Sequence, residues 1–240
     1  MLTQTMIPPT NSNLFALSGS DTVVEKDDSL VIGATATFGS VFQHPAVKQF
    51  PALYMALRHL TAPMSRQKKS IGRVLCGDAE AQGPAAALLA LDAQLLITRP
   101  RGERIISLLD YFGHEESTLA YNEVVRSFVV SNETRLKSVY QSVDYLRSGQ
   151  AVCGVAVWVR CYQDVVEDIR IVLSGCVPFP VLLPHIAAAL RGHECTADRA
   201  EEATRKLGQE RLLVYNPSLK MGSHLFNLSR TLIKRAVLTI

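Results

Sequence analysis

The spacing of hydrophobic and polar positions divides the start of the chain into a predicted strand, helix and loop. β-Branched and apolar residues predict a strand over residues 30–37 that ends near Gly39. Apolar residues recur at helical spacing in residues 49–61, and Pro63 is expected to stop this helix. Residues 67–77 follow as a predicted loop.

An apolar helix and three strands are predicted next. Pro84 fits the first turn of the helix, where its missing N–H has no partner to lose, and the helix ends near Leu91. Two strands joined by a Pro-Arg-Gly turn are predicted at residues 94–98 and 104–107. A further strand over residues 122–130 closes the first half of the chain.

The second half begins with three runs rich in β-branched residues, at residues 136–143, 151–161 and 165–173. In the middle run, valines alternate with other residues at a period of two, which is typical of a strand with one covered face. Helices are predicted at residues 183–190 and 196–207, the second with Thr196 as its N-cap. The last helix is predicted to begin with Asn216 as N-cap and Pro217 at the first helical position.

These elements predict an α+β fold in three parts. Residues 1–29 are rich in Pro, Ser, Asn and Thr without a sustained period, so we expect an irregular arm. Residues 30–132 are expected to form a first domain. Residues 133–240 are expected to form a second domain of about three antiparallel strands covered by helices.

Composition excludes several classes of protein. The chain has 240 residues, of which 48% are hydrophobic and 20% charged, so it can bury a core. Its apolar runs are shorter than the roughly 18 to 20 residues of a membrane span. Residues 1–7 lack the basic start of a signal peptide, so we expect a cytoplasmic protein without a membrane segment. The net charge of +3 is too small to indicate a nucleic-acid partner.

Candidate catalytic and metal-binding patterns are lacking. The five cysteines form no C-x-x-C pair, and the six histidines form no H-E-x-x-H array, so we expect reduced thiols and no metal site. The chain also has no G-x-S-x-G or Walker pattern.

Charge is distributed unevenly. No Asp or Glu occurs between Ser29 and Gly77, whereas six basic residues do: Lys48, Arg58, Arg66, Lys68, Lys69 and Arg73. This surplus could attract an anion such as a dinucleotide pyrophosphate, or an acidic partner surface. The alternative is a solvated basic loop without a ligand.

The sequence Ser-Ile-Gly-Arg-Val at residues 70–74 precedes a helix that contains Leu-Leu-Ala-Leu-Asp-Ala at residues 88–93. By itself it indicates a tight turn before a packed helix. With Leu-Val-Ile-Gly-Ala-Thr-Ala-Thr at residues 30–37 upstream and residues 102–112 downstream, it resembles the FAD-binding medium subunit of the molybdenum hydroxylases. That family includes the medium chain of carbon monoxide dehydrogenase and the flavin domain of xanthine dehydrogenase. The resemblance runs from about Leu30 to the C-terminus.

The resemblance implies a truncated flavin-type α/β domain followed by the family's C-terminal flavoprotein domain. The family holds the FAD pyrophosphate with two loops. The first is an Ala-Gly-Gly-Thr-Asp turn ahead of the first predicted strand. Residues 18–21, Ser-Gly-Ser-Asp, resemble it only weakly, so we expect this loop to be absent. The second is Thr-Ile-Gly-Gly-Asn, which Ser70, Ile71 and Gly72 match in part.

The second half of this second loop differs from the family. Arg73 replaces the second Gly and Val74 the Asn, while Glu80 and Gly83 stand where the family has Pro and Asp. Arg73 could fill the space of the phosphate or bind an anion itself.

Two positions would face the flavin ring if the resemblance holds there. Val125 is compatible with the family's apolar residue, and Gln141, with Lys137 close by, stands where the family has a Lys or Arg. The implied cofactor contacts are therefore Ser70, Ile71, Gly72, Arg73 and Val125, with FAD as the implied cofactor.

The resemblance predicts a subunit of a molybdopterin-dependent oxidoreductase that relays electrons from an iron–sulfur subunit to an acceptor, with its own flavin site weakened. The implied partners are a molybdopterin-containing large subunit and an iron–sulfur small subunit, and the chain is not expected to be catalytic on its own. A flavin-free structural or assembly subunit of such a complex is the alternative. Without an N-terminal subdomain, the chain is also expected to expose an apolar surface that a partner covers.

Overall fold

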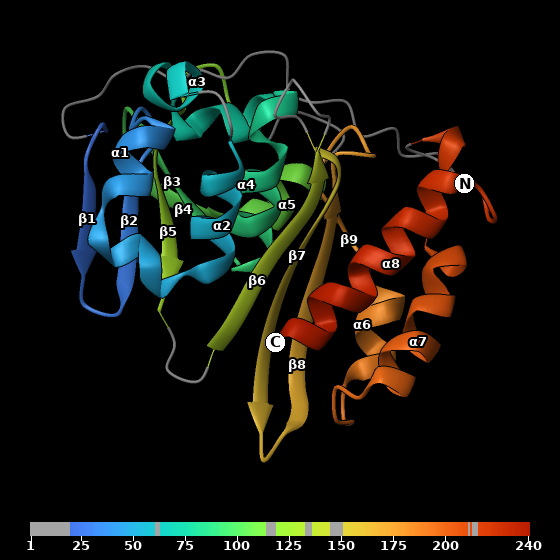
Figure 1. Ribbon diagram of the computed structural model, residues 1–240. Coiled ribbons are helices and arrows are strands. Elements are labelled where there is room, and N and C mark those ends of the chain that lie inside the picture. The colour runs from blue at the N-terminus through green and yellow to red at the C-terminus, as the bar shows by residue number, and fades with distance from the viewer. Residues whose placement is uncertain are drawn as a thin grey trace.

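Two antiparallel sheets and the helices packed between and beside them make up the structure (Figure 1). This computed structural model describes residues 20–60, 63–113, 119–132, 136–144, 151–210, 212 and 216–240. The predicted α+β class is confirmed, because helices and antiparallel strands alternate along the chain.

The first sheet has five strands in the order β1-β2-β5-β3-β4, all antiparallel. Its strands are β1 (Val23–Lys26), β2 (Ser29–Gly33), β3 (Gln94–Arg99), β4 (Gly102–Ser107) and β5 (Val124–Ser131). The β3–β4 hairpin is the one predicted from the Pro-Arg-Gly turn, so that prediction is confirmed.

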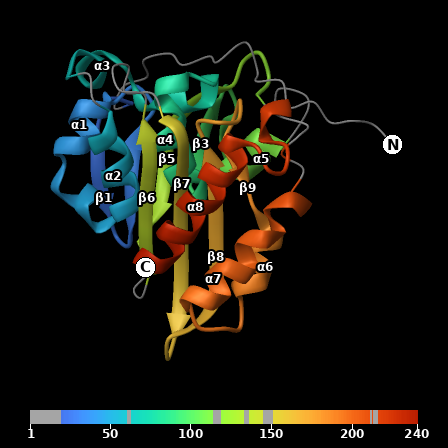
Figure 2. The same ribbon diagram turned by 45° about the vertical axis from the view of Figure 1, so that its right-hand side comes forward.

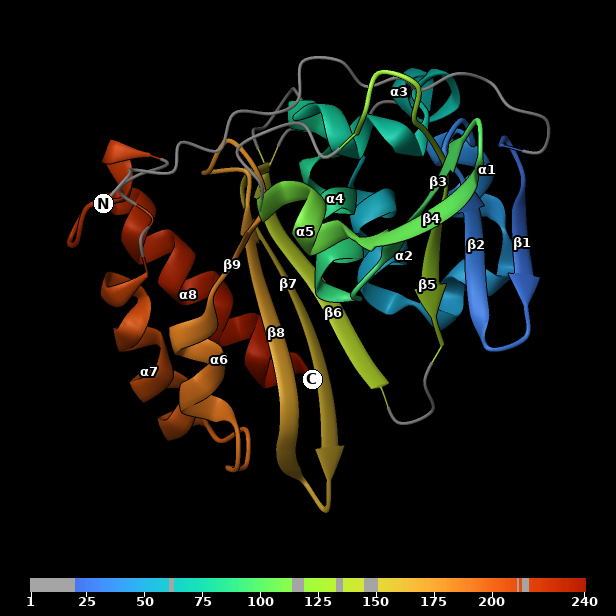
Figure 3. The ribbon, with the colours of Figure 1, turned by 180° about the vertical axis from the view of Figure 1, so that it is seen from behind.

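Helices and helical turns occupy the rest of the first half. They are α1 (Phe38–Gln43), η1 (Pro45–Gln49), α2 (Pro51–His59), α3 (Pro63–Lys68), η2 (Ile71–Cys76), η3 (Ala79–Ala81), α4 (Gln82–Ala90) and α5 (Leu108–Gly113). Every residue of α4 is buried, because α4 packs against α2 and against the second sheet, and α5 lies beside it (Figure 3). A helix with an apolar surface all round is stable only in such a position.

The second sheet has four strands in the order β6-β7-β8-β9. They are β6 (Leu136–Asp144), β7 (Ala151–Tyr162), β8 (Val165–Ser174) and β9 (Val181–Leu182). Its outer face is covered by α6 (Pro184–Leu190), α7 (Ala197–Arg205) and α8 (His224–Thr239), with the short turns η4 (Lys206–Gln209) and η6 (Pro217–Leu219) (Figures 1 and 2).

Both faces of β7 are buried, so the expectation of one covered face is wrong. Val155, Val157 and Val159 belong to the core under α6 to α8, which we call the second core. Ala156 and Trp158 point the opposite way and join the first core, which lies between the first sheet, α2 and α4. The period of two is present, but the small and aromatic residues on the other face pack on the first half of the chain.

Four further element predictions need correction. The first predicted strand ends at Gly33, because Thr37 instead caps α1 by accepting a hydrogen bond from the Ser40 amide at 3.0 Å. Most of the predicted loop 67–77 is the 3-10 helix η2. The helix predicted over residues 49–61 does end before Pro63, at His59, and Pro63 itself begins α3. The arm before residue 30 is not wholly irregular, since β1 lies within it.

The last correction concerns the C-terminal helix. Asn216 accepts a hydrogen bond from the Ser218 amide at 2.9 Å, but it caps only the short turn η6. The long helix α8 begins at His224 after its own cap, Ser223. The predicted cap of α7 is confirmed, because Thr196 Oγ1 accepts from the Arg199 amide at 3.3 Å.

Candidate functional site

The backbone of residues 70–74 is bonded to the residues that follow β2 of the first sheet. Ser70 forms an isolated antiparallel bridge with Thr37. The Ile71 amide donates to the Ala36 carbonyl at 2.8 Å, and the Gly72 amide donates to the Ala34 carbonyl at 2.9 Å. The backbone amides of Ile71 and Gly72 therefore already donate hydrogen bonds within the chain and are not free to donate to a phosphate.

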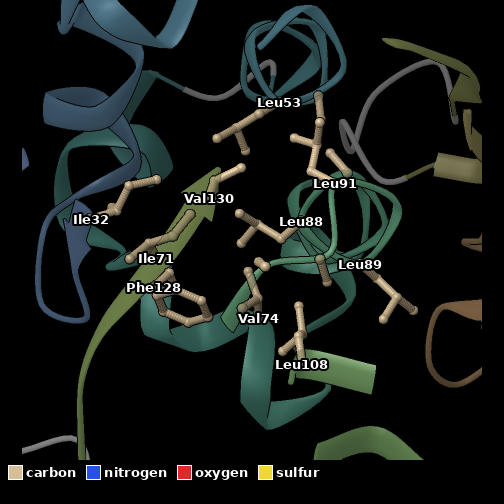
Figure 4. Packing of buried hydrophobic residues seen from close by; sticks show 14 of the residues in the cluster. Ile32, Leu53, Ile71, Val74, Leu88, Leu89, Leu91, Leu108, Phe128 and Val130 are labelled. Carbon is tan, nitrogen blue, oxygen red and sulfur yellow. The ribbon is translucent and has the colours of Figure 1, made fainter. Parts of the chain in front are cut away.

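The apolar side chains of this segment are part of the first core. Ile71 and Val74 are buried and lie near Phe128 of β5 and Leu88 of α4 (Figure 4). The valine in place of the family's Asn therefore packs in the interior.

The basic side chains at the segment are paired with carboxylates. Arg73 Nε lies 2.6 Å from Asp78 Oδ2. Lys69 Nζ lies 3.3 Å from the same oxygen and 2.9 Å from Glu80 Oε2. The local surplus of positive charge is thus neutralised at these two cations, because the first acidic residues after the basic stretch fold back onto it.

Asp78 is the centre of this cluster. Its side chain is 12% exposed, whereas that of Arg73 is 48% exposed. Burial alone would raise the pKa of the Asp78 carboxyl, but the hydrogen bonds from Arg73, the Glu80 amide and Lys69 outweigh it and hold the pKa below its usual range. Burial likewise lowers the pKa of Lys69, and its bonds to Glu80 and Asp78 outweigh that effect and raise it.

Tyr140 fills the space beside Gly83, the position where the family has Asp. A Cβ at Gly83 would lie 2.7 Å from the Tyr140 hydroxyl oxygen, and a Cβ at Gly154 would also meet that oxygen. The Tyr140 side chain is 2% exposed, so it has little room to move. Sequence reasoning missed this residue, because Tyr140 lies on β6, more than fifty positions from Gly83 along the chain.

The remaining predicted positions lie elsewhere. Val125 is 1% exposed and pairs with Ile97 in the first sheet, so its side chain is in the core. Backbone bonds also link its strand to the segment, from the Ala34 amide to the Arg126 carbonyl and from the Gly72 amide to the Ala34 carbonyl.

The expected cation is also directed away from the segment. Lys137 Nζ donates to the Ile240 carbonyl at 3.0 Å, and Gln141 Nε2 donates to Thr239 Oγ1 at 2.9 Å. Both side chains therefore bind the end of α8, on the face of β6 opposite Tyr140.

A small cavity lies between α2, α4 and β6. It has a volume of about 10 Å³ and is lined in part by Glu80, Gly83, Tyr140 and the pair His59 and Asp144, whose Nδ1 and Oδ2 atoms lie 3.4 Å apart. That is room for about one water molecule, whereas sites for cofactor-sized ligands are on the order of 300 to 1,000 Å³.

The described residues form neither a metal-binding cluster nor a membrane-spanning helix. In the described parts of the chain, no three His, Cys, Asp or Glu side chains gather so that they could hold a metal ion. Among the helices that the structure describes, none combines the length and apolar character needed to cross a bilayer.

The fold defines a two-sheet α+β protein in which a helix-covered sheet packs on a five-stranded domain, and solved structures share it. A carbon monoxide dehydrogenase from Hydrogenophaga pseudoflava that lacks the Mo-pyranopterin moiety superposes with a TM-score of 0.78 at 23% identity, over 91% of this chain and 77% of that chain. Quinoline 2-oxidoreductase from Pseudomonas putida 86 gives 0.77 at 20% identity, over 93% of this chain and 78% of that one.

Sequence comparisons identify the family. Residues 6–131 match the FAD binding domain in molybdopterin dehydrogenase, and residues 139–238 match the CO dehydrogenase flavoprotein C-terminal domain. The chain belongs to the family of FAD-binding medium subunits of the molybdenum hydroxylases. The first match begins at residue 6, upstream of the start near Leu30 that the resemblance indicated.

Curated relatives are similar over most of this chain. The medium subunit of nicotine 6-hydroxylase from Paenarthrobacter nicotinovorans is 27% identical over 220 residues, which are 89% of this chain and 75% of that subunit. A putative xanthine dehydrogenase FAD-binding subunit from Escherichia coli K12 is 24% identical over 178 residues, 72% of this chain and 60% of that one.

The family is described by its FAD-binding domain. The pyrophosphate of FAD is therefore the group that residues 69–74 would have to hold. A phosphate site needs free amides or cations. Here the amides of Ile71 and Gly72 are bonded to the carbonyls of residues 36 and 34, just after β2, and Lys69 and Arg73 are paired with carboxylates. The described residues of the second loop therefore fit the pyrophosphate poorly.

Proposed function

We propose that this chain is the medium subunit of a molybdopterin-dependent oxidoreductase complex in which electrons pass from an iron–sulfur subunit to an acceptor, and that its own flavin site is weakened. The supporting observation is that both halves of the chain match, in order, the two domains of such subunits. The proposed partners are a molybdopterin-containing large subunit and an iron–sulfur small subunit, in the cytoplasm. Residual flavin contacts are proposed at Ser70, Ile71, Gly72, Arg73 and Val125.

Exposed apolar side chains offer a contact surface for a partner subunit. Ile105 on the edge strand β4 and Leu109 at the start of α5 are both exposed. Burial of such side chains contributes to subunit association.

The test is to express the chain with and without the products of the neighbouring reading frames and to purify it through a tag. We expect the large and small subunits to copurify, with flavin well below one equivalent per complex. A chain that purifies alone, in the presence of both candidate partners, would contradict the proposal. The control is the same preparation from a strain that lacks the tagged chain.

A second candidate function is a flavin-free structural or assembly subunit of the same kind of complex. It is favoured by the pairing of Arg73 with Asp78 and by the Tyr140 hydroxyl, which occupies the space beside Gly83. The same preparation separates the two candidates. Full molybdenum and iron with no flavin absorbance would favour the structural role, whereas a stoichiometric flavin signal would exclude it.

A further inference from the structure

The carboxylate of Asp78 binds both the backbone of η3 and two cations. Its Oδ1 accepts a hydrogen bond from the Glu80 amide at 3.0 Å and so caps η3. Its Oδ2 lies 2.6 Å from Arg73 Nε and 3.3 Å from Lys69 Nζ. Lys69 Nζ also donates to Oδ1, at 3.5 Å. One oxygen therefore also stabilises the backbone, and the carboxylate as a whole is shared by two cations.

The backbone fixes Asp78 in this place. Gly77 has a φ of 67°, a left-handed conformation that ends η2 and turns the chain back. A Cβ at Gly77 would lie 2.7 Å from the Phe179 ring, so the turn is also packed against the second half of the chain. Asp78 is thus presented to Lys69 and Arg73 by a turn with little freedom to open.

The two cations that Asp78 holds, Lys69 and Arg73, are of the side-chain types that bind phosphate. Arg and Lys donate to phosphate oxygens in the same way as to carboxylate oxygens, through short charge-assisted hydrogen bonds. An anion from solution must compete with a carboxylate that is already in contact and largely removed from water. Such an internal competitor lowers the affinity for any external anion.

We propose that Asp78 is an internal anion that closes the segment of residues 69–73 to phosphate and pyrophosphate groups. Glu80 assists it by holding Lys69 at 2.9 Å. The inference concerns the same segment as the proposed function and rests on it for the identity of the excluded ligand. It assigns to one carboxylate the selectivity against a dinucleotide.

The experiment measures binding of inorganic pyrophosphate to the full chain by isothermal titration calorimetry. The variant Asp78→Asn keeps an oxygen that can cap η3 but removes the negative charge. We expect its affinity for pyrophosphate to be at least about tenfold higher than that of the wild type, and the gain to shrink as salt is raised. Adding Glu80→Gln should increase the gain, because Lys69 is then released as well.

Two controls establish where the gain arises. Asp92→Asn removes an exposed carboxylate that pairs with Arg170 at 3.1 Å, away from the segment, and should leave pyrophosphate binding unchanged. Adding Arg73→Gln to Asp78→Asn should return the affinity to the wild-type value. A general effect of net charge would instead appear in the Asp92 variant.

Three results would overturn the inference. The first is equal pyrophosphate affinity in the wild type and in folded Asp78→Asn. The second is a gain that persists with Arg73→Gln. The third is loss of folding in both Asp78→Asn and Asp78→Ser, since both residues can cap η3, and the charge would then be needed for structure alone. Copurification with partner subunits is measured separately from pyrophosphate binding. A failure of the proposed function can therefore be distinguished from a failure of this inference.

Discussion

Gly83 lies against the Tyr140 hydroxyl, and adding a single methyl group tests this contact. Because Tyr140 is also confined by Gly154, it cannot move away from a new Cβ. We expect Gly83→Ala to lower the free energy of unfolding by about 1 to 3 kcal/mol, as overpacking of a core does. Urea titration followed by circular dichroism measures the change.

A matched control is available in α5. Gly113→Ala adds the same methyl group where, apart from the neighbouring residues and the helix backbone, the described chain has no atom within 4 Å, and it should change stability by no more than about 0.5 kcal/mol. Adding Tyr140→Phe to Gly83→Ala removes the hydroxyl and should recover part of the loss. Equal effects at Gly83 and Gly113 would refute the contact.

The pKa of Asp78 predicts a pH dependence of stability. The folded-state pKa is held below the ordinary value of 3.8, so its ion pairs stabilise the protein above that value and are lost as pH falls through the folded pKa. We expect wild type to be more stable than Asp78→Asn at pH 7 and the difference to vanish in acid, as pH falls through the lowered pKa of Asp78. Urea midpoints at several pH values measure it; a difference that stays constant with pH would argue against the assignment.

At the scale of elements, the N-cap of α8 is Ser223 and not the predicted Asn216. Ser223 Oγ accepts a hydrogen bond from the Phe226 amide at 3.2 Å, so Ser223→Ala should lower stability by about 1 kcal/mol. Ser218→Ala changes the same residue type in the neighbouring turn η6 and should have a smaller effect. If Ser218→Ala is the more damaging of the two, the cap is misassigned.

At the scale of the whole molecule, the second sheet joins the two halves. Trp158, the single tryptophan, is buried in the first core, and the Arg170 guanidinium lies 4.4 Å from its ring centroid. Arg170 also contacts Asp92 after α4, at 3.1 Å. Residues from both halves therefore share one core.

This shared core predicts cooperative unfolding. We expect the urea transition followed by Trp158 fluorescence to coincide with that followed by circular dichroism, because separating the halves would expose the first core. Two transitions with different midpoints would show that the halves are stable apart. The Asp92→Asn variant should lower both midpoints together.

Local patterns in the sequence determined much of the fold. The hairpin at residues 94–107, the three β-branched runs and the cap at Thr196 depend on turn chemistry and periodicity, which act over a few residues. The order of motifs around residues 70–74 also determined the family, as the matches to both domains confirm.

Tertiary structure decided which charges, amides and spaces around the candidate segment are already occupied. A sequence shows that Arg73 and Asp78 are five positions apart, but only the turn at Gly77 brings their charges into contact. It shows a glycine at position 83, but only the packing of β6 on α4 places Tyr140 there. Whether the amides of Ile71 and Gly72 are free likewise depends on their bonds to residues 34 and 36, because hydrogen-bond partners distant in sequence are set by the fold.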